Sequence, residues 1–383
     1  MADKQIAVIC KLMPLYRLGV FRELSKKRQG YEFTCFGDTK EQAGIQGIPW
    51  ELANKKEGVN WIKTRNYFYI PERLLWQTGI IKRIFFSKYD YFIFEGGVYH
   101  LATWVFAILC RLRGKKVFFW THGFKGLDKG LKKVIRILYF RLANALLLYG
   151  NYSKEIMMRS GFSEKKMFVI YNSLDCSEQL KMVNSAKFYI LSNEKAKIFN
   201  DPSLFTTIFI GRLVKGKKVE LVIKAVKDFS LKKTPINCII VGDGPEIDFI
   251  KNYISSNNLE GKVFLTGALH EEKDICKYFE MADLMVSPGN VGLNCIHSLA
   301  YGVPVLTHDD FRFQNPEVEA IAPGETGFLF EYNNHDDMLR KLQEWKNMKV
   351  TKEEIRIKCH NMLLKRYNPV SHAQRIIEAI NQF

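Results

Sequence analysis

The sequence predicts an α/β fold with two doubly wound parallel sheets. The chain has 383 residues, more than one hydrophobic core usually spans. Strand-like apolar runs alternate with helix-like amphipathic stretches from end to end, as in repeated βα units. The polar, poorly periodic stretch Lys181–Ser203 divides these units into two series. We therefore expect a Rossmann-like domain over residues 1–190, a second over 204–350, and C-terminal helices over 352–383 that break near Asn368-Pro369 and cross back to the first domain.

Each series has its own set of expected strands. Those of the first are Gln5–Cys10, Tyr31–Phe36, Tyr89–Glu95, Lys116–Trp120, Ala145–Tyr149 and Met167–Tyr171; those of the second are Thr207–Ile210, Asn237–Val241, Lys262–Thr266, Leu284–Ser287, Val303–Leu306 and Thr326–Phe330. Doubly wound sheets bind ligands beyond the carboxyl ends of their strands, so we look for functional residues in the loops that follow them.

Composition restricts the class of protein. Apolar residues make up 47% and charged residues 25%, a balance typical of globular domains. The chain has no uninterrupted apolar run of about 18 residues and no signal-peptide pattern at its start, so we expect a cytoplasmic protein. The cysteines are scattered within apolar runs, which predicts buried free thiols and no metal site.

The positive charge lies in the first half. Residues 1–190 hold 32 Lys+Arg against 15 Asp+Glu, whereas residues 191–383 hold 25 of each. Such a half attracts a polyanion: an acidic membrane surface, phosphorylated lipid or nucleic acid. No nucleic-acid-binding motif is present, so nucleic acid is not an expected partner. Leu75–Lys88 and Phe124–Arg141 mix aromatic rings with cations and are candidates to lie on an anionic bilayer; the alternative is core-packed helices with solvated basic faces.

Two motifs follow strands early in the second half. In Phe209-Ile-Gly-Arg-Leu-Val-Lys-Gly-Lys-Lys218, Gly211 lets the backbone come close to a ligand, and Arg212 and Lys217 supply two cations suited to a diphosphate. In Ile240-Val-Gly-Asp-Gly-Pro-Glu246, Gly242 turns the chain sharply off a buried strand, which suits either a ligand contact or an ordinary turn.

Two further motifs complete the series. The strand Val263-Phe-Leu-Thr-Gly267 ends at Thr266 and Gly267, whose backbone is suited to hydrogen-bond a nucleobase. The segment Ser287–Leu306 is predicted to form a strand, a Gly-rich loop and a helix, a combination suited to bind anions. The candidate binding residues in this loop are Asn290, Val291, Gly292 and Leu293.

Taken in this order, the motifs resemble the donor-binding domain of the retaining glycosyltransferases of family 4. The resemblance is good over residues 205–332 and looser over the first half. It implies the GT-B fold, in which two Rossmann-like domains face each other across a cleft. It also implies that Arg212 and Lys217 neutralise the diphosphate of a nucleotide sugar, and that His122 lies near the donor sugar. A hydrogen-bonded structural histidine is the alternative for His122.

The chain departs from the family at two positions. Family members usually carry two glutamates eight positions apart around the Gly-rich loop, and those positions are Gly289 and His297 here. His297 is a candidate to hydrogen-bond the donor ribose in place of the second glutamate. Three candidates remain for the first: the loop backbone from Asn290 to Leu293, Glu317, or Glu319.

The resemblance therefore implies a glycosyltransferase that transfers a hexosyl- or deoxyhexosyl-type sugar with retention. The expected donor is a nucleotide sugar acting as co-substrate, with no other cofactor and no metal. The expected acceptor is a saccharide or lipid-linked saccharide in bacterial surface polysaccharide synthesis, with the enzyme cytoplasmic or peripheral on the inner face of the cell membrane. The missing glutamates motivate a second hypothesis, a catalytically weakened nucleotide-sugar-binding scaffold that partners another transferase. A GT-B epimerase is a third, but it needs acid and base carboxylates that we do not find in the motifs.

Overall fold

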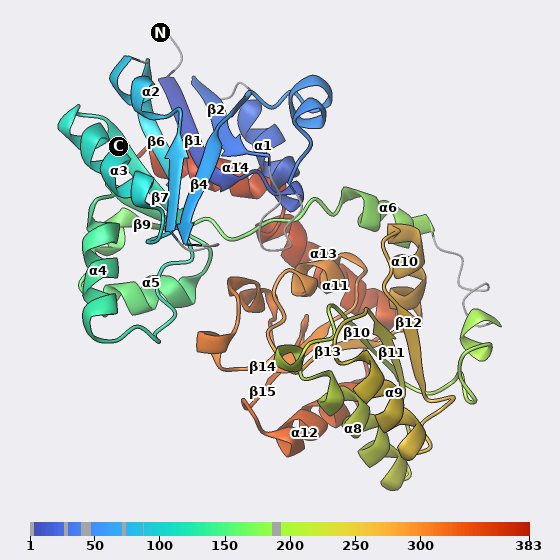
Figure 1. Cartoon of the computed structure of the whole chain (residues 1–383). Helices are drawn as coiled ribbons and strands as arrows, with labels where there is room; N and C mark the ends of the chain where they lie inside the picture. The colour runs from blue at the N-terminus through green and yellow to red at the C-terminus, as the bar shows by residue number, and fades with distance from the viewer. Residues whose placement is uncertain (1–3, 27–29, 40–46, 71–73, 87, 186–192) are drawn as a thin grey trace. The chain divides into compact units, whose positions relative to one another are not determined.

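The structure, a computed structural model, describes residues 4–26, 30–39, 47–70, 74–86, 88–185 and 193–383 (Figure 1). These residues form two compact units. The first comprises Met1–Asp175 with Arg366–Phe383, and the second comprises Cys176–Lys365. The predicted boundary at Lys181–Ser203 lies partly outside the described residues, and helix α6 (Ser177–Ser185) already packs against helix α10 (Glu272–Met281) of the second unit.

A seven-stranded parallel sheet forms the centre of the first unit, in the order β3-β2-β1-β6-β7-β8-β9. Its strands are β1 (Lys4–Leu12), β2 (Tyr31–Asp38), β3 (Trp61–Lys63), β6 (Tyr89–Glu95), β7 (Lys116–Thr121), β8 (Ala145–Leu148) and β9 (Met167–Val169). The strands β4 (Arg65–Ile70) and β5 (Leu74–Thr78) form a separate antiparallel pair. A parallel sheet of this kind is buried on both faces, which explains why its strands are continuous apolar runs.

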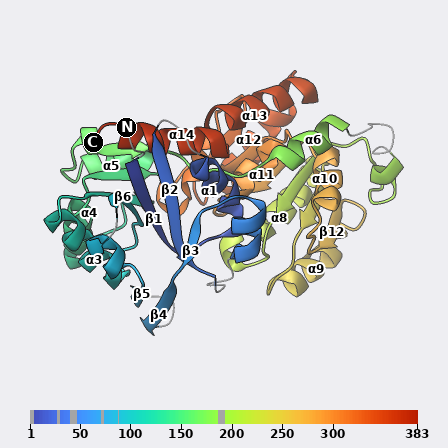
Figure 2. The same ribbon diagram turned by 90° about the horizontal axis from the view of Figure 1, so that it is seen from above.

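Helices cover both faces of this sheet (Figure 2). They are α1 (Leu18–Ser25), α2 (Ile81–Phe86), α3 (Leu101–Leu112), α4 (Gly130–Arg141), α5 (Asn151–Met158) and α14 (Pro369–Ile380). One core joins α1 and α14 to side chains such as Phe118 and Leu147, and the other joins α3 and α4 to their strand neighbours Phe119 and Leu146. The C-terminal helix α14 therefore completes the core of the N-terminal unit.

The second unit contains a six-stranded parallel sheet in the order β12-β11-β10-β13-β14-β15. Its strands are β10 (Thr206–Ile210), β11 (Asn237–Val241), β12 (Val263–Gly267), β13 (Leu284–Ser287), β14 (Val305–His308) and β15 (Gly327–Phe330). Its helices besides α6 are α8 (Val219–Leu231), α9 (Ile247–Ser256), α10 (Glu272–Met281), α11 (Asn294–Ala300), α12 (His335–Lys346) and α13 (Lys352–Arg366).

The predicted fold class of two parallel, helix-covered sheets is confirmed, and so is the helix break near Asn368-Pro369. The cysteines are buried and free, as expected. The alternative that Leu75–Lys88 forms a core-packed helix with a solvated basic face is wrong. This stretch contains most of strand β5 and the short helix α2. The side chains of β5 alternate between the two faces of a strand, with Leu75 and Gln77 buried, so no helical face forms there.

Candidate functional site

Two glycines at neighbouring strand ends bring two turns of the second unit into direct contact. Gly211 follows β10 and Gly242 follows β11, with φ values of 145° and 146°. A Cβ atom on Gly242 would lie 2.0 Å from the carbonyl oxygen of Gly211. Any side chain at Gly242 would therefore push the turns apart, and the edge of the sheet presents bare peptide groups.

The two predicted cations lie on the turn that follows Gly211. The Arg212 side chain is exposed, and no hydrogen bond or ion pair joins it to another described residue. Lys217 is partly buried, and its Nζ donates a hydrogen bond to the carbonyl oxygen of Asn290. Burial lowers the pKa of Lys217, because desolvation penalises the charged ammonium. The structure thus connects the first predicted motif with the Gly-rich loop.

The Gly-rich loop is held by a buried glutamine that the sequence did not single out. Gln314 Oε1 accepts the backbone N–H of Val291 at 3.0 Å, and its Nε2 donates to Thr307 Oγ1 at 2.8 Å. On the other side, Asn294 Nδ2 donates to the carbonyl oxygen of Ile210 at 2.6 Å. Gly292 adopts a left-handed conformation with φ of 55°. The loop geometry is therefore fixed before any ligand binds.

Gly289 is covered by the turn that carries Lys217. A Cβ atom on Gly289 would lie 2.2 Å from the carbonyl oxygen of Gly216 and 2.8 Å from Cα of Lys217. This contact gives a physical reason for the first departure from the family pattern. A glutamate side chain does not fit at position 289 unless the turn moves.

His297, on α11, lies beside a carboxylate from the neighbouring helix α10. Its Nε2 is 3.1 Å from Glu272 Oε2, and the hydroxyl of Tyr301 donates to the same oxygen. Burial alone would raise the pKa of Glu272, but the hydrogen bonds from His297 and Tyr301 lower it to about 2. No sequence motif singles out Glu272. It stands next to the position where the family glutamate was expected, so the site retains an acidic group.

The remaining predicted residues of this unit have different surroundings. Thr266 Oγ1 donates to the carbonyl oxygen of Gly267 at 2.8 Å, and a Cβ on Gly267 would meet nothing within 4 Å. Glu317 is 3% exposed in a short turn that packs on α11, and its charge adds to burial in raising the pKa of Cys295. Glu317 thus lies in the interior beside α11, and its role in donor binding stays a prediction.

His122 belongs to the first unit, directly after β7. It lines a cavity of about 630 Å³ together with Lys11, Arg17, Glu95, His100 and Tyr149. Its ring centre lies 4.5 Å from that of Tyr149. The pocket wall desolvates the ring, and Lys125 and Arg17 add positive charge, so the pKa of His122 is lowered. His122 therefore faces this cavity as a neutral imidazole at pH 7.

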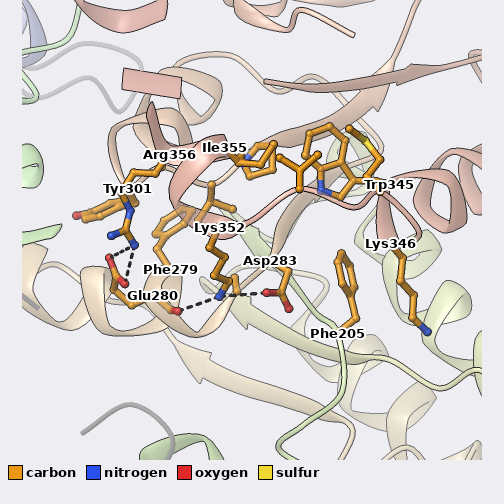
Figure 3. Close-up of a pocket in the computed structure, with 16 residues that line it drawn as sticks. Phe205, Phe279, Glu280, Asp283, Tyr301, Trp345, Lys346, Lys352, Ile355 and Arg356 are labelled. Carbon is orange, nitrogen blue, oxygen red and sulfur yellow. Dashed lines mark hydrogen bonds and ion pairs between the residues drawn. The ribbon is translucent and has the colours of Figure 1, made fainter. Parts of the chain in front are cut away.

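A smaller cavity of about 200 Å³ lies on α13 in the second unit (Figure 3). Its lining residues Phe205, Asp283 and Val303 come just before strands, at the edge of the sheet opposite the loops described above. Arg356 donates to both carboxylate oxygens of Glu280, at 3.1 and 3.2 Å. These paired charges attach α13 to α10, so we interpret this cavity as part of the packing rather than as a ligand site.

Comparison with known proteins assigns a class to this arrangement. Residues 192–361 match the family model described as glycosyl transferases group 1. A poly(ribitol-phosphate) alpha-N-acetylglucosaminyltransferase of Staphylococcus aureus is 23% identical over 250 residues, 61% of this chain and 50% of that protein. An N-acetylgalactosamine-N,N'-diacetylbacillosaminyl-diphospho-undecaprenol 4-alpha-N-acetylgalactosaminyltransferase of Campylobacter jejuni is 27% identical over 195 residues, 50% of this chain and 47% of that protein. The matched segment thus spans about half the length of these relatives.

Solved structures show the same fold over the whole chain. A glycosyltransferase from Rickettsia africae has a TM-score of 0.72 at 15% identity, covering 100% of this chain and 99% of its own. The Anabaena protein HepE, in complex with UDP, has a TM-score of 0.70 at 16% identity, covering 99% and 100%. The chain has the GT-B fold of two Rossmann-like domains, as its sequence predicted.

Proposed function

We propose that this chain transfers a hexosyl- or deoxyhexosyl-type sugar, with retention, from a nucleotide sugar to a saccharide or lipid-linked saccharide. One observation carries the proposal: the Lys217 ammonium is fixed against the Gly-rich loop at Asn290, on the same turn as the unpaired Arg212. Two cations beside exposed peptide groups at the carboxyl edge of a parallel sheet suit a diphosphate.

In this proposal, the leaving nucleotide gains negative charge as the glycosidic bond breaks. Arg212 and Lys217 stabilise that charge, and because the Lys217 ammonium is already held at Asn290, its share of the stabilisation needs little reorganisation. The transition state resembles an oxocarbenium ion. The departing phosphate takes the proton from the acceptor hydroxyl on the same face of the sugar, which gives retention without a separate base. We propose that the cations act here without a metal ion.

The ribose of the donor is proposed to lie against His297 and Glu272. The Glu272 carboxylate is charged and accepts hydrogen bonds, so it can receive ribose hydroxyls as the family glutamate does. His297 positions this carboxylate through their 3.1 Å contact. The UDP bound in HepE makes a uridine nucleotide the first donor type to test.

The acceptor is proposed to belong to bacterial surface polysaccharide synthesis. The relative from Staphylococcus aureus is named for poly(ribitol-phosphate), and the one from Campylobacter jejuni for a diphospho-undecaprenol saccharide. Both names describe acceptors that carry phosphate. The basic first half of this chain suits acceptors of that charge.

A peripheral position on the inner face of the cell membrane is part of this proposal. Helix α3 exposes Leu101, Val105, Ile108 and Leu112 along one face. Arg111, Arg113 and Lys115 lie beside the end of this stripe, as on surfaces that bind anionic lipid. In the residues that the structure describes, no helix has both the length and the apolar character to cross a bilayer. If the purified chain does not sediment with anionic vesicles at low salt, the proposed membrane position is wrong.

The central test is thermal denaturation of the full chain with a panel of nucleotide sugars. A true donor binds only the folded state and raises the melting temperature by mass action. The stabilising donor is then assayed for transfer with an extract of lipid-linked acceptors. Stabilisation without hydrolysis or transfer from any donor supports the scaffold alternative. If no nucleotide sugar stabilises the chain, both hypotheses are wrong.

A further inference from the structure

The cavity of the first unit carries an excess of fixed positive charge. Four cations line it: Lys11, Arg17, Lys132 and Arg136. Glu95 is its one lining carboxylate among the described residues, while Asp128 pairs with Lys132 at 3.2 Å and Arg136 at 2.6 Å from outside the lining. Two positive charges therefore remain without a matching carboxylate.

Arg17 is the most deeply buried of these cations. It is 7% exposed, its Nη2 donates to the hydroxyl of Tyr149, and its guanidinium lies 5.0 Å from the ring centre of Trp120. An arginine remains charged when buried, so its charge acts on the cavity through a low-dielectric wall. A buried cation held by aromatic neighbours is suited to bind an anion and needs little reorganisation.

Glu95 and two histidines, His100 and His122, also line the cavity. The Glu95 carboxylate accepts the backbone N–H of Lys11 at 2.9 Å. Burial opposes its charge, but His100, Arg17 and Lys11 outweigh burial and lower the pKa of Glu95. Burial lowers the pKa of His100, so this ring is neutral at pH 7. Neutral imidazoles and one carboxylate can hydrogen-bond sugar hydroxyls beside an anionic group.

Part of the cavity wall is apolar, and this part continues onto the protein surface. Leu131 and Ile135 of α4 line the cavity, and with Val134 and Leu138 they form one face of the helix. These side chains are 74%, 40%, 50% and 54% exposed, respectively. A contiguous exposed apolar stripe is a typical feature of an interaction site.

The neighbouring helix α3 also exposes an apolar stripe, from Leu101 to Leu112. The two helices are in contact, because the ring of Trp104 on α3 lies against that of Tyr139 on α4 with ring centres 4.9 Å apart. Both views of the chain show α3 and α4 on the same side of the sheet (Figures 1 and 2). A cationic cavity therefore lies directly beside an uncovered apolar face.

We propose that this cavity binds the phosphate or diphosphate head of a lipid, whose hydrocarbon chain lies along α4. Cations alone would suit a soluble phosphate, and an apolar stripe alone would suit any hydrophobic surface. Their continuity at Leu131 and Ile135 selects a ligand that is anionic at one end and apolar at the other. This inference rests on the proposed function, since it makes the lipid-phosphate part of the acceptor the group that the first unit recognises.

Farnesyl diphosphate, inorganic pyrophosphate and farnesol separate the contributions of head and tail. We expect calorimetric titration of the full chain to show farnesyl diphosphate binding at least tenfold more tightly than either of the other two. The double variant Arg212→Ala/Lys217→Ala weakens any diphosphate binding in the second unit and should keep this preference. Equal affinity for pyrophosphate and farnesyl diphosphate would assign the cavity to soluble phosphate and overturn the proposal. Loss of binding in the double variant would also overturn it.

Variants in the cavity test each end of the ligand. Leu131→Gln should reduce farnesyl diphosphate affinity at least fivefold and leave pyrophosphate unchanged; Leu231→Gln, equally exposed at 72% on α8, should change neither. Arg17→Gln should weaken both ligands at least tenfold. If this variant does not fold, Lys132→Gln, whose side chain is 62% exposed, replaces it with an expected loss of at least threefold. An unchanged affinity in Leu131→Gln contradicts the proposal.

The nucleotide-sugar stabilisation test distinguishes this inference from the proposed function. If nucleotide sugars stabilise Leu131→Gln and wild type equally while farnesyl diphosphate fails to bind either, only the lipid-phosphate inference fails. If farnesyl diphosphate binds and no nucleotide sugar does, the proposed function fails and the cavity remains a lipid-phosphate site.

Discussion

Gly289 and Gly216 meet backbone to backbone, so a Cβ on Gly289 would lie 2.2 Å from the carbonyl oxygen of Gly216. The contact joins the Gly-rich loop to the turn that carries Lys217. Position 289 is also where the family pattern carries a glutamate. The glycine and the position of the lysine turn are therefore coupled: a larger residue at 289 requires a different turn.

Gly289→Ala should destabilise the chain and weaken donor binding together. Forcing a methyl group against a backbone oxygen costs about 1–3 kcal/mol in a packed region. The turn shifts, and Lys217 loses its position at Asn290. Thermal denaturation with and without the stabilising nucleotide sugar measures both effects.

Gly216→Ala is the matched control for this variant. A Cβ on Gly216 would meet nothing within 4 Å, and its φ lies outside the left-handed region. We expect its free energy of unfolding to change by less than about 1 kcal/mol. If the two alanine variants behave alike, the coupling of Gly289 to the turn is wrong.

Arg212→Ala and Lys217→Ala should each lower transfer at least tenfold, which is about 1.4 kcal/mol of transition-state stabilisation. Lys218→Ala removes the same charge one residue away, but the Lys218 ammonium lies over the Tyr332 ring and donates to Asn333. We expect near-normal turnover in this control. Unchanged kcat/KM in folded Arg212 and Lys217 variants would remove both residues from the diphosphate site.

The sheet strands could be predicted because each is a continuous apolar run between turn residues. The strands that were not predicted are β3 (Trp61–Lys63), β4 and β5, a three-residue edge strand and a hairpin outside the main sheets. Short edge elements bury only one side and leave a weak sequence pattern. The helical spacing of α4 suggested either a core or a membrane face. The structure buries Tyr139 and Phe140 and exposes Leu131, a distinction that periodicity alone does not make.

The candidate site was predictable where backbone geometry determines the residue type. Gly211, Gly242 and Gly292 stood out because a turn after a strand requires glycine. Gln314 and Glu272 did not, since the contact of Gln314 with Val291 and that of Glu272 with His297 each join residues more than twenty positions apart. Such contacts form only when the chain folds, and no local sequence motif predicts them.

Glu272→Gln should remove a part of the chain's stability that depends on pH. The pKa of Glu272 is about 2 in the folded state against 4.5 ordinarily, so its carboxylate stabilises the fold above pH 4.5. That contribution is lost as the pH falls from 4.5 toward 2. The melting temperatures of wild type and Glu272→Gln should therefore converge over this window. Glu271→Gln, on the exposed neighbouring residue, should follow wild type throughout.

A second readout separates ribose recognition from stability. Wild type should bind UDP at least tenfold more tightly than 2′,3′-dideoxy-UDP at pH 7.5, and Glu272→Gln should lose most of this preference. A variant that keeps the full preference would leave Glu272 as a structural partner of His297.

Two ion pairs join α13 to the rest of the second unit, Arg356–Glu280 and Lys352–Asp283 (Figure 3). We expect Arg356→Met to destabilise the chain more than Lys352→Met. Arg356→Met leaves the Glu280 carboxylate, 3% exposed, without its ion-pair partner, and such a change costs about 3–5 kcal/mol. Lys352→Met breaks the more exposed pair with Asp283 and should cost less than about 1 kcal/mol.

The stability lost in Arg356→Met should depend on pH. Burial already raises the pKa of Glu280, and the loss of Arg356 raises it further, so the free energy of unfolding lost in this variant should shrink between pH 7 and pH 5. Urea denaturation of the three proteins at both pH values measures these differences. Equal losses in the two variants would show that the Glu280–Arg356 pair does not hold α13 in place.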